Sequence, residues 1–428
     1  MRRVALFAAI PVLFNVVSGA VITYDPVVGA VTPNSIDIFV HTTKSASVAL
    51  QLWPPTGPVR TTPTQVTQSG TNFSARFHLA SLSPDTIYRY RVLVNSVLVG
   101  PERTFETAPR LGAVRPLRVA VFADSNENGR YDVYGAALAD QPDLLVQLGD
   151  FPHWNPSTKT PVTIANWHLM NRTVLAHSFY GPHIPAALAL RSVPLVHAWD
   201  DHDYCTNNAN KTCAYKAIAR QAFDASFPSY PRPNPTAGIW HSFRYAQCEF
   251  FLLDLRSQKD NATIADGPTK SMLDGDDIPN DQLTWLLNGL LSSTAPCKVI
   301  LSSLSWNPTV GKGEAWRAYA YERTLIANWI DTKAVTGVFV LSGDIHSGGG
   351  CDDGTNSGLP ECTIPATNIT LQLANGCTGG YCGDWNLGFN DPAPRAGYLI
   401  VDFGVNGGVR ITIKGYTGDV RQVVTLWP

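Results

Sequence analysis

The sequence predicts an α/β fold in two parts, a small all-β sandwich followed by a larger layered domain of buried strands flanked by helices. The chain has 428 residues, 44% of them hydrophobic, which exceeds one typical domain and can fill a large core. Residues 21–110 read as short alternating strands and contain no cysteine. After Pro116 the apolar runs become fully hydrophobic, which is typical of strands covered on both faces.

The first twenty residues have the pattern of a secretory signal peptide. Arg2 and Arg3 precede an apolar stretch from Val4 to Val17, and the small residues Ser18-Gly19-Ala20 follow. We therefore expect cleavage after Ala20 and a secreted, extracellular protein. A membrane anchor is the alternative, but the apolar stretch is too short to cross a bilayer comfortably, so no membrane anchor is expected.

Glycosylation sequons and cysteines fit an exported protein. Five Asn-x-Ser/Thr sequons begin at Asn72, Asn171, Asn210, Asn261 and Asn368. The eight cysteines are even in number and contain no CxxC pair, so they favour disulfide bonds over a zinc site. Our working hypothesis pairs nearest neighbours along the chain: 205 with 213, 248 with 297, 351 with 362, and 377 with 382.

The formal net charge of -2 gives no broad electrostatic surface. We therefore expect neither nucleic acid nor an anionic membrane as a bulk partner. A monomer acting on a small molecule is the expected form.

In the first part, the turn residues divide four strands, at residues 35–41, 47–53, 72–79 and 87–95. Alternation in the last of these places Tyr88 and Tyr90 on one face and the intervening arginines on the other. The stretch LSPDTIYRYRVLV resembles a fibronectin type III strand with its preceding turn, so the tyrosines are expected in a sandwich core. Residues 108–112 are the expected linker.

In the second part, four apolar runs end directly in carboxylate and imidazole groups. The residues at these ends are Asp124; Asp150; Asp200, Asp201, His202 and Asp203; and Asp344 and His346. Amphipathic segments at 216–227 and 281–291 are expected helices between such runs. Open α/β sheets place active sites at strand ends. One Asp alone is as well explained as a helix cap, but four such ends together predict a metal site that does hydrolysis.

Three short motifs carry a resemblance: LGD at 148–150, WDDHDYCTNN at 199–208 and SGDIH at 342–346. With GIWHSFRY, FFLLDLRS and DQLTWL, they resemble the PhoD-like (alkaline phosphatase D) family of the calcineurin-like metallophosphoesterase superfamily. The resemblance covers nearly the whole mature chain. It implies a fibronectin type III-like domain at 21–110 and a layered β-sandwich metallophosphatase domain at 115–428.

The resemblance also implies roles for individual residues. Asp150 looks like the carboxylate that bridges two metals, and Asp201 like a ligand of the second metal. His202 would lie beside the substrate and protonate the leaving oxygen, although it could instead hold Asp200 or Asp203 structurally. Asp344 and His346 would serve different metals, so two or more metal ions are implied.

The chain departs from the family pattern in two places. Asp124 precedes Ser125 where the family has Ser-Cys, and His153 stands where relatives carry a tyrosine that binds ferric iron. We keep both as expected metal ligands. No histidine lies between Trp285 and Ser342, so the second metal site would be rich in oxygen, with Asn207 nearby as a catalytic candidate.

This ligand set leaves the metal open among Ca, Mn, Mg, Fe and Zn, and favours Ca, Mn or Mg at the second site. Arg256 could hold a phosphate or form an ion pair with a buried carboxylate. The predicted function is metal-dependent hydrolysis of small phosphate esters, with a metal-bound hydroxide attacking phosphorus. A phosphodiesterase or phospholipase D-like activity, or an inactive secreted binding protein, are the alternatives.

Overall fold

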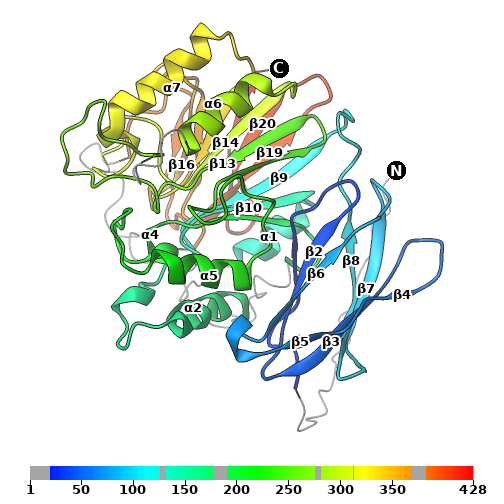
Figure 1. The fold of residues 1–428 in the computed structure, drawn as a ribbon. Coiled ribbons are helices and arrows are strands. Elements are labelled where there is room, and N and C mark those ends of the chain that lie inside the picture. Colours follow the sequence, from blue (N-terminus) through cyan, green and yellow to red (C-terminus); the bar gives the residue numbers. More distant parts are fainter. Residues whose placement is uncertain are drawn as a thin grey trace.

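The computed structural model describes residues 20–125, 132–151, 153–176, 190–274, 281–311, 313–368 and 382–427. Almost all of the predicted signal peptide lies outside these ranges. The described strands form three sheets, and helices lie along the two sheets of the larger part (Figure 1). The predicted α/β layered fold is confirmed.

The first part of the chain is a β-sandwich. One side contains β1 (Val27–Gly29), β2 (Ile36–His41) and β6 (Ser74–Leu79). The other is a five-stranded sheet of β3 (Ala46–Trp53), β4 (Arg60–Thr61), β5 (Gln65–Thr67), β7 (Ile87–Val94) and β8 (Val97–Glu106). Tyr88 and Tyr90 are buried between the sides, as their alternation predicts.

The sandwich and the larger part share a sheet. β1 runs parallel to β11 (Leu195–Ala198) with Gly29 opposite Leu195, so β1, β2 and β6 extend the nine-stranded central sheet. A Cβ atom at Gly29 would lie 2.5 Å from the carbonyl oxygen of Leu195, so only glycine allows this approach. The domain boundary near residues 110–115 and the fibronectin type III likeness stay predictions.

Two sheets form the layers of the larger part. The nine-stranded sheet adds β9 (Leu117–Phe122), β10 (Leu144–Leu148), β19 (Gly397–Phe403), β20 (Val409–Gly415) and β21 (Val420–Trp427). The seven-stranded sheet contains β12 (His241–Tyr245), β13 (Cys248–Leu252), β14 (Cys297–Ser302), β15 (Val338–Ser342), β16 (Gly349–Asp352), β17 (Glu361–Thr363) and β18 (Phe389–Asn390). β10, β14 and β15 are buried at every position, as their continuous apolar sequences predict.

Helices lie on the outside of this pair of sheets (Figure 1). They are α1 (Val133–Ala139), α2 (Ile164–Ala176), α4 (Asp201–Tyr204), α5 (Lys216–Ser226), α6 (Gln282–Ser292) and α7 (Ala320–Thr332), with 3-10 turns η1 (Ser69–Thr71), η2 (Pro156–Thr158) and η3 (Trp316–Tyr319). Leu290 of α6 and Ile326 of α7 belong to the same buried cluster as Ile300 of β14, so these helices cover the seven-stranded sheet. The predicted helices at 216–227 and 281–291 are confirmed to within one residue. No helix in the described ranges combines the length and the apolar character needed to cross a membrane.

The cysteine pairing hypothesis is right for two pairs and wrong for a third. Cys205–Cys213 and Cys351–Cys362 are disulfide bonds. Cys248 and Cys297 face each other across β13 and β14 but are free, buried thiols, which pack there as small apolar side chains. The fourth predicted pair involves residue 377, which lies outside the described residues.

Candidate metal centre

Four strands of the two sheets end at the same place. Asp124 follows β9, Asp150 follows β10, α4 follows β11, and Asp344 follows β15. Gly343, just before Asp344, brings the sheets together, since a Cβ atom there would lie 2.8 Å from the Cβ of Ala123. Strand ends that are distant in sequence therefore present their side chains to one another, as the sequence predicts.

The backbone turns sharply at these strand ends. Asp124, Asp150, Asp344 and His346 all have positive φ angles, of 58°, 52°, 64° and 52°. This left-handed region is unfavourable for residues other than glycine, and Asp and His tolerate it better than most. Such strain gathers at functional sites, where the surrounding structure holds it in place.

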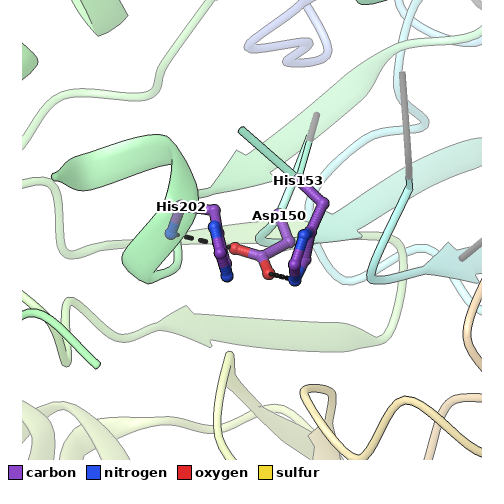
Figure 2. A group of neighbouring side chains, drawn as sticks. All are labelled: Asp150, His153 and His202. Carbon is purple, nitrogen blue, oxygen red and sulfur yellow. Dashed lines mark hydrogen bonds and ion pairs between the residues drawn. The ribbon is translucent and has the colours of Figure 1, made fainter. Parts of the chain in front are cut away.

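Asp150 lies at the middle of the centre. Its Oδ1 accepts a 3.2 Å hydrogen bond from the backbone N–H of His202, and its Oδ2 lies 3.5 Å from Nε2 of His153 (Figure 2). The rings of His153 and His202 pack with their centroids 3.5 Å apart. These three side chains offer ligand atoms within 4.8 Å of one another, the spacing of a metal site.

Two further ligand groups share Asp150. The first adds Asp124, Asp344 and His346, in which Nε2 of His346 lies 3.3 Å from Asp344 and 3.5 Å from Asp124. The second adds Asp200 and Asp201. Asp150 is the residue common to all three groups. Its bridging of two metals stays a prediction.

Several buried polar atoms of the centre lack hydrogen-bond partners among the described residues. They are Asp124 Oδ2, Asp150 Oδ2, His153 Nε2, Asp201 Oδ1 and His202 Nδ1. Buried polar atoms normally have a partner, because leaving them without one costs free energy. Carboxylate oxygens and imidazole nitrogens that converge without partners fit a bound metal cation.

The pKa values of these side chains also favour a bound cation. Burial, with the neighbouring His202 and His346, lowers the pKa of His153 to about 3, so its imidazole is the neutral form that binds metals. Burial and repulsion from Asp201 raise the pKa of Asp150 well above its ordinary value. Without a cation, the surroundings of Asp150 therefore disfavour its charged form.

A buried arginine lies beneath the carboxylates. Arg256 donates to Asp200 from Nε at 2.6 Å and from Nη2 at 2.7 Å, and it also pairs with Glu314. Its Nη2 lies 3.6 Å from both Asp201 and Asp344. Of the two roles considered for Arg256, the ion pair with buried carboxylates is the one present, and its guanidinium has no exposed surface to offer a phosphate.

Asp200 and Asp203 are the carboxylates that His202 would hold if its role were structural. Ser303 and Arg256 both donate to Asp200, and the backbone N–H groups of Phe151 and Asp200 donate to Asp203. Among the described residues, both carboxylates therefore have hydrogen-bond donors other than the imidazole of His202. Its side chain instead lies against His153 and 3.8 Å from Asp201.

Asn207 lies at the edge of the centre. It is exposed, and its backbone N–H donates to Asn155 at 3.0 Å. The neighbouring Asn208 makes the closer contact, since its backbone N–H donates to Asp201 at 2.6 Å. Within the described structure no contact joins the side chain of Asn207 to the metal cluster, so its catalytic role stays a prediction.

Sequence reasoning considered an ion pair for Arg256 but missed Glu314 as one of its partners. Glu314 lies far from the motifs in sequence, and it accepts a 2.9 Å hydrogen bond from Lys259 besides pairing with Arg256. The usable signal was the position of Arg256 just after a buried strand, where an arginine needs a carboxylate partner.

The described residues thus place a cluster of buried Asp and His side chains at the strand ends of two packed sheets. A model of the PhoD-like phosphatase family matches residues 119–352, which is more than half of the chain. The chain belongs to this family.

Individual proteins are similar to this chain in sequence or in fold. Alkaline phosphatase D of Bacillus subtilis (strain 168) is 27% identical over 324 residues, which make up 66% of this chain and 55% of that protein. The match thus spans just over half the length of this curated relative. The solved structure of PhoD superposes with a TM-score of 0.73 at 19% identity, covering 94% of this chain and 88% of that one. A purple acid phosphatase from yellow lupin seeds shares the fold with a TM-score of 0.61 at 13% identity, over 94% of this chain and 73% of that one.

Proposed function

We propose that the chain is a secreted enzyme that hydrolyses small phosphate esters at the centre around Asp150, with two bound divalent cations. The observation that carries this proposal is the convergence of buried Asp and His atoms that lack hydrogen-bond partners. The signal-peptide pattern supports secretion, and so do the two disulfide bonds, which persist in oxidising compartments.

Charge balance supports the number of cations. Arg256 and Lys259 neutralise Asp200 and Glu314 through direct contacts. Four carboxylates of the centre remain, on Asp124, Asp150, Asp201 and Asp344, and all four are buried. Two divalent cations would balance these four charges, as buried charges require.

The ligand groups suggest how two cations would be held. One group joins Asp150 to Asp124, Asp344 and His346, and the second joins it to Asp200 and Asp201, so Asp150 would contribute to both cation sites. The second group contains only carboxylate oxygens, which favours Ca, Mg or Mn there. The first group includes imidazole, which also suits Zn or Fe.

Bound cations of this kind supply polarisation of a phosphoryl oxygen and a lowered pKa for water. The chain's own residues would position the reacting groups. His202 is held by its backbone bond to Asp150 and by ring contact with His153, which leaves its imidazole beside the site. We assign it the role of donating a proton to the leaving oxygen of the ester.

The experiment is hydrolysis of p-nitrophenyl phosphate and bis-p-nitrophenyl phosphate by the secreted protein, before and after removal of metals by a chelator. Activity that is lost on chelation and restored by one of the divalent cations supports the proposal. The ratio of the two rates assigns the monoester or diester preference. Failure to cleave either ester with any added cation would refute the proposed function.

A further inference from the structure

The five glycosylation sequons have very different surroundings in the fold. Those at Asn210 and Asn261 lie in surface loops, whereas those at Asn72 and Asn171 lie in packed regions. The fifth begins at Asn368, which is 9% exposed, and its threonine lies outside the described residues. An attached glycan is bulky and must point into solvent, so the folded chain can carry glycans only where the asparagine amide is accessible.

Asn210 and Asn261 share one local geometry. Oδ1 of Asn210 accepts hydrogen bonds of 2.9 Å from both the backbone N–H and the hydroxyl of Thr212. Oδ1 of Asn261 accepts the corresponding bonds from Thr263, at 3.0 and 2.9 Å. In both sequons the threonine donates its hydrogen bonds to the amide oxygen of the asparagine. The amide nitrogen, which is the atom that bonds to sugar, takes no part in these contacts.

Asn72 and Asn171 are held in the opposite way. Asn72 is 3% exposed, its Nδ2 is buried, and its Oδ1 accepts a 2.7 Å hydrogen bond from Arg172. Asn171 is 4% exposed, and its Nδ2 donates to Ser226 at 2.9 Å, between α2 and α5. A sugar on either nitrogen would have to enter space that packed side chains already fill.

The two accessible sequons lie side by side. The backbone N–H of Lys211 donates to the carbonyl of Lys259 at 3.1 Å, and Nζ of Lys211 lies 2.8 Å from Asp260. Asn210 also belongs to the loop closed by the Cys205–Cys213 disulfide, the same loop in which Asn208 contacts Asp201. The Asn210 sequon is therefore on a loop that borders the metal centre, and the Asn261 sequon is on a loop packed beside it.

We propose that the folded protein carries N-linked oligosaccharides at Asn210, on a loop that borders the catalytic centre, and at Asn261 on the adjoining loop, and none at Asn72 or Asn171. In the transfer, the amide nitrogen bonds to the anomeric carbon of a lipid-diphosphate-linked oligosaccharide. The bond from that carbon to the diphosphate oxygen breaks, the lipid diphosphate leaves, and the nitrogen's proton passes to a base of the transferring enzyme. Modification at the packed sites would block folding, so the native protein is free of it there.

This inference rests on the proposed export, and its test separates the two. The full chain is produced in a eukaryotic host that adds N-glycans, and the active protein in the medium is digested and its glycopeptides are mapped. We expect glycans at Asn210 and Asn261, and unmodified peptides for Asn72 and Asn171. An active protein with a glycan at Asn72 or Asn171, or with none at Asn210 and Asn261, would overturn the inference.

Matched variants test the same sites without glycopeptide mapping. Thr212→Ala and Thr263→Ala should each lower the apparent mass on a gel by one glycan, and the double variant by two. Thr212→Ser and Thr263→Ser preserve the sequons and should leave the apparent mass unchanged. Thr173→Ala should leave the pattern unchanged. If the chain does not reach the medium, the proposed export fails, and the same mapping on a chain whose residues 1–20 are replaced by a proven leader still decides the glycan sites.

Discussion

Arg256 and Asp200 form a two-bonded ion pair, at 2.6 and 2.7 Å, in which neither side chain has more than 1% of its surface exposed. The pair lies directly beneath the carboxylates of the metal centre. It therefore links the stability of the fold to the arrangement of the ligands.

Replacement of Arg256 by Gln should lower the free energy of unfolding by about 3–5 kcal/mol, because removing one partner leaves buried carboxylates without compensation. Urea unfolding of the metal-free protein measures this. Arg91→Gln is the matched control, since Arg91 pairs with Glu102 at 3.0 Å on the surface of the sandwich. The control should cost no more than about 1 kcal/mol. Equal effects of the two changes would show that the buried pair has no special role.

Asp150→Asn should abolish metal binding and lower hydrolysis more than about 100-fold, since even residues that only support metal ligands change activity by 10- to 100-fold. The fold should survive, because Asn can still accept the hydrogen bond from His202 and its neutrality removes repulsion from Asp201. Metal content by mass spectrometry, together with thermal unfolding, checks both statements. A variant that keeps its metal would contradict the bridging position.

His202→Asn should lower the turnover number by about 100- to 10,000-fold for alkyl phosphate esters, the range expected when a general acid is lost. The loss should be much smaller for p-nitrophenyl phosphate, whose leaving group needs little protonation. A comparison of turnover numbers for the two esters at equal metal content tests this. The same loss for both esters would instead point to a role in holding metal.

Glu361 should make the stability depend on pH. Burial raises its pKa from 4.5 to about 7, because its carboxyl lies wholly inside the protein, where Trp306 N–H donates to it at 2.9 Å. An acid with a raised pKa contributes stability that is full below its unfolded pKa and is lost as the pH rises through the folded value.

Glu361→Gln removes this ionisation. Relative to the natural chain, the variant should gain up to about 3 kcal/mol in unfolding free energy between about pH 5 and pH 8. Urea unfolding across this range measures the difference, and Glu102→Gln at the surface controls for the change of residue type. A difference that stays constant with pH would contradict the raised pKa.

The continuous apolar runs predicted the buried strands well, since a strand covered on both faces has little choice of residue. The same runs located Asp124, Asp150, Asp201 and Asp344, because each follows its strand directly. The sequence could not predict the contacts between those ends. It did not indicate that Glu314 would meet Arg256, because they belong to separate loops that only the fold brings together.

The disulfide pairing is a second feature that the sequence did not fully predict. Spacing alone suggested a bond between Cys248 and Cys297, and these residues do lie opposite each other on adjacent strands. The structure keeps them as free thiols, because proximity in a sheet does not determine the side-chain geometry that a disulfide needs. The shared sheet between the sandwich and the larger part was equally hidden, since it depends on the close approach that Gly29 allows.

The most direct test of the proposed metal-dependent phosphatase activity is the rate of p-nitrophenyl phosphate hydrolysis by chelator-stripped protein, titrated with each divalent cation beside an Asp150→Asn control. We predict that the stripped natural chain is inactive, that at least one cation restores its activity, and that no cation restores the variant. Full activity of the stripped protein, or equal rates for the natural chain and the variant, would contradict the account.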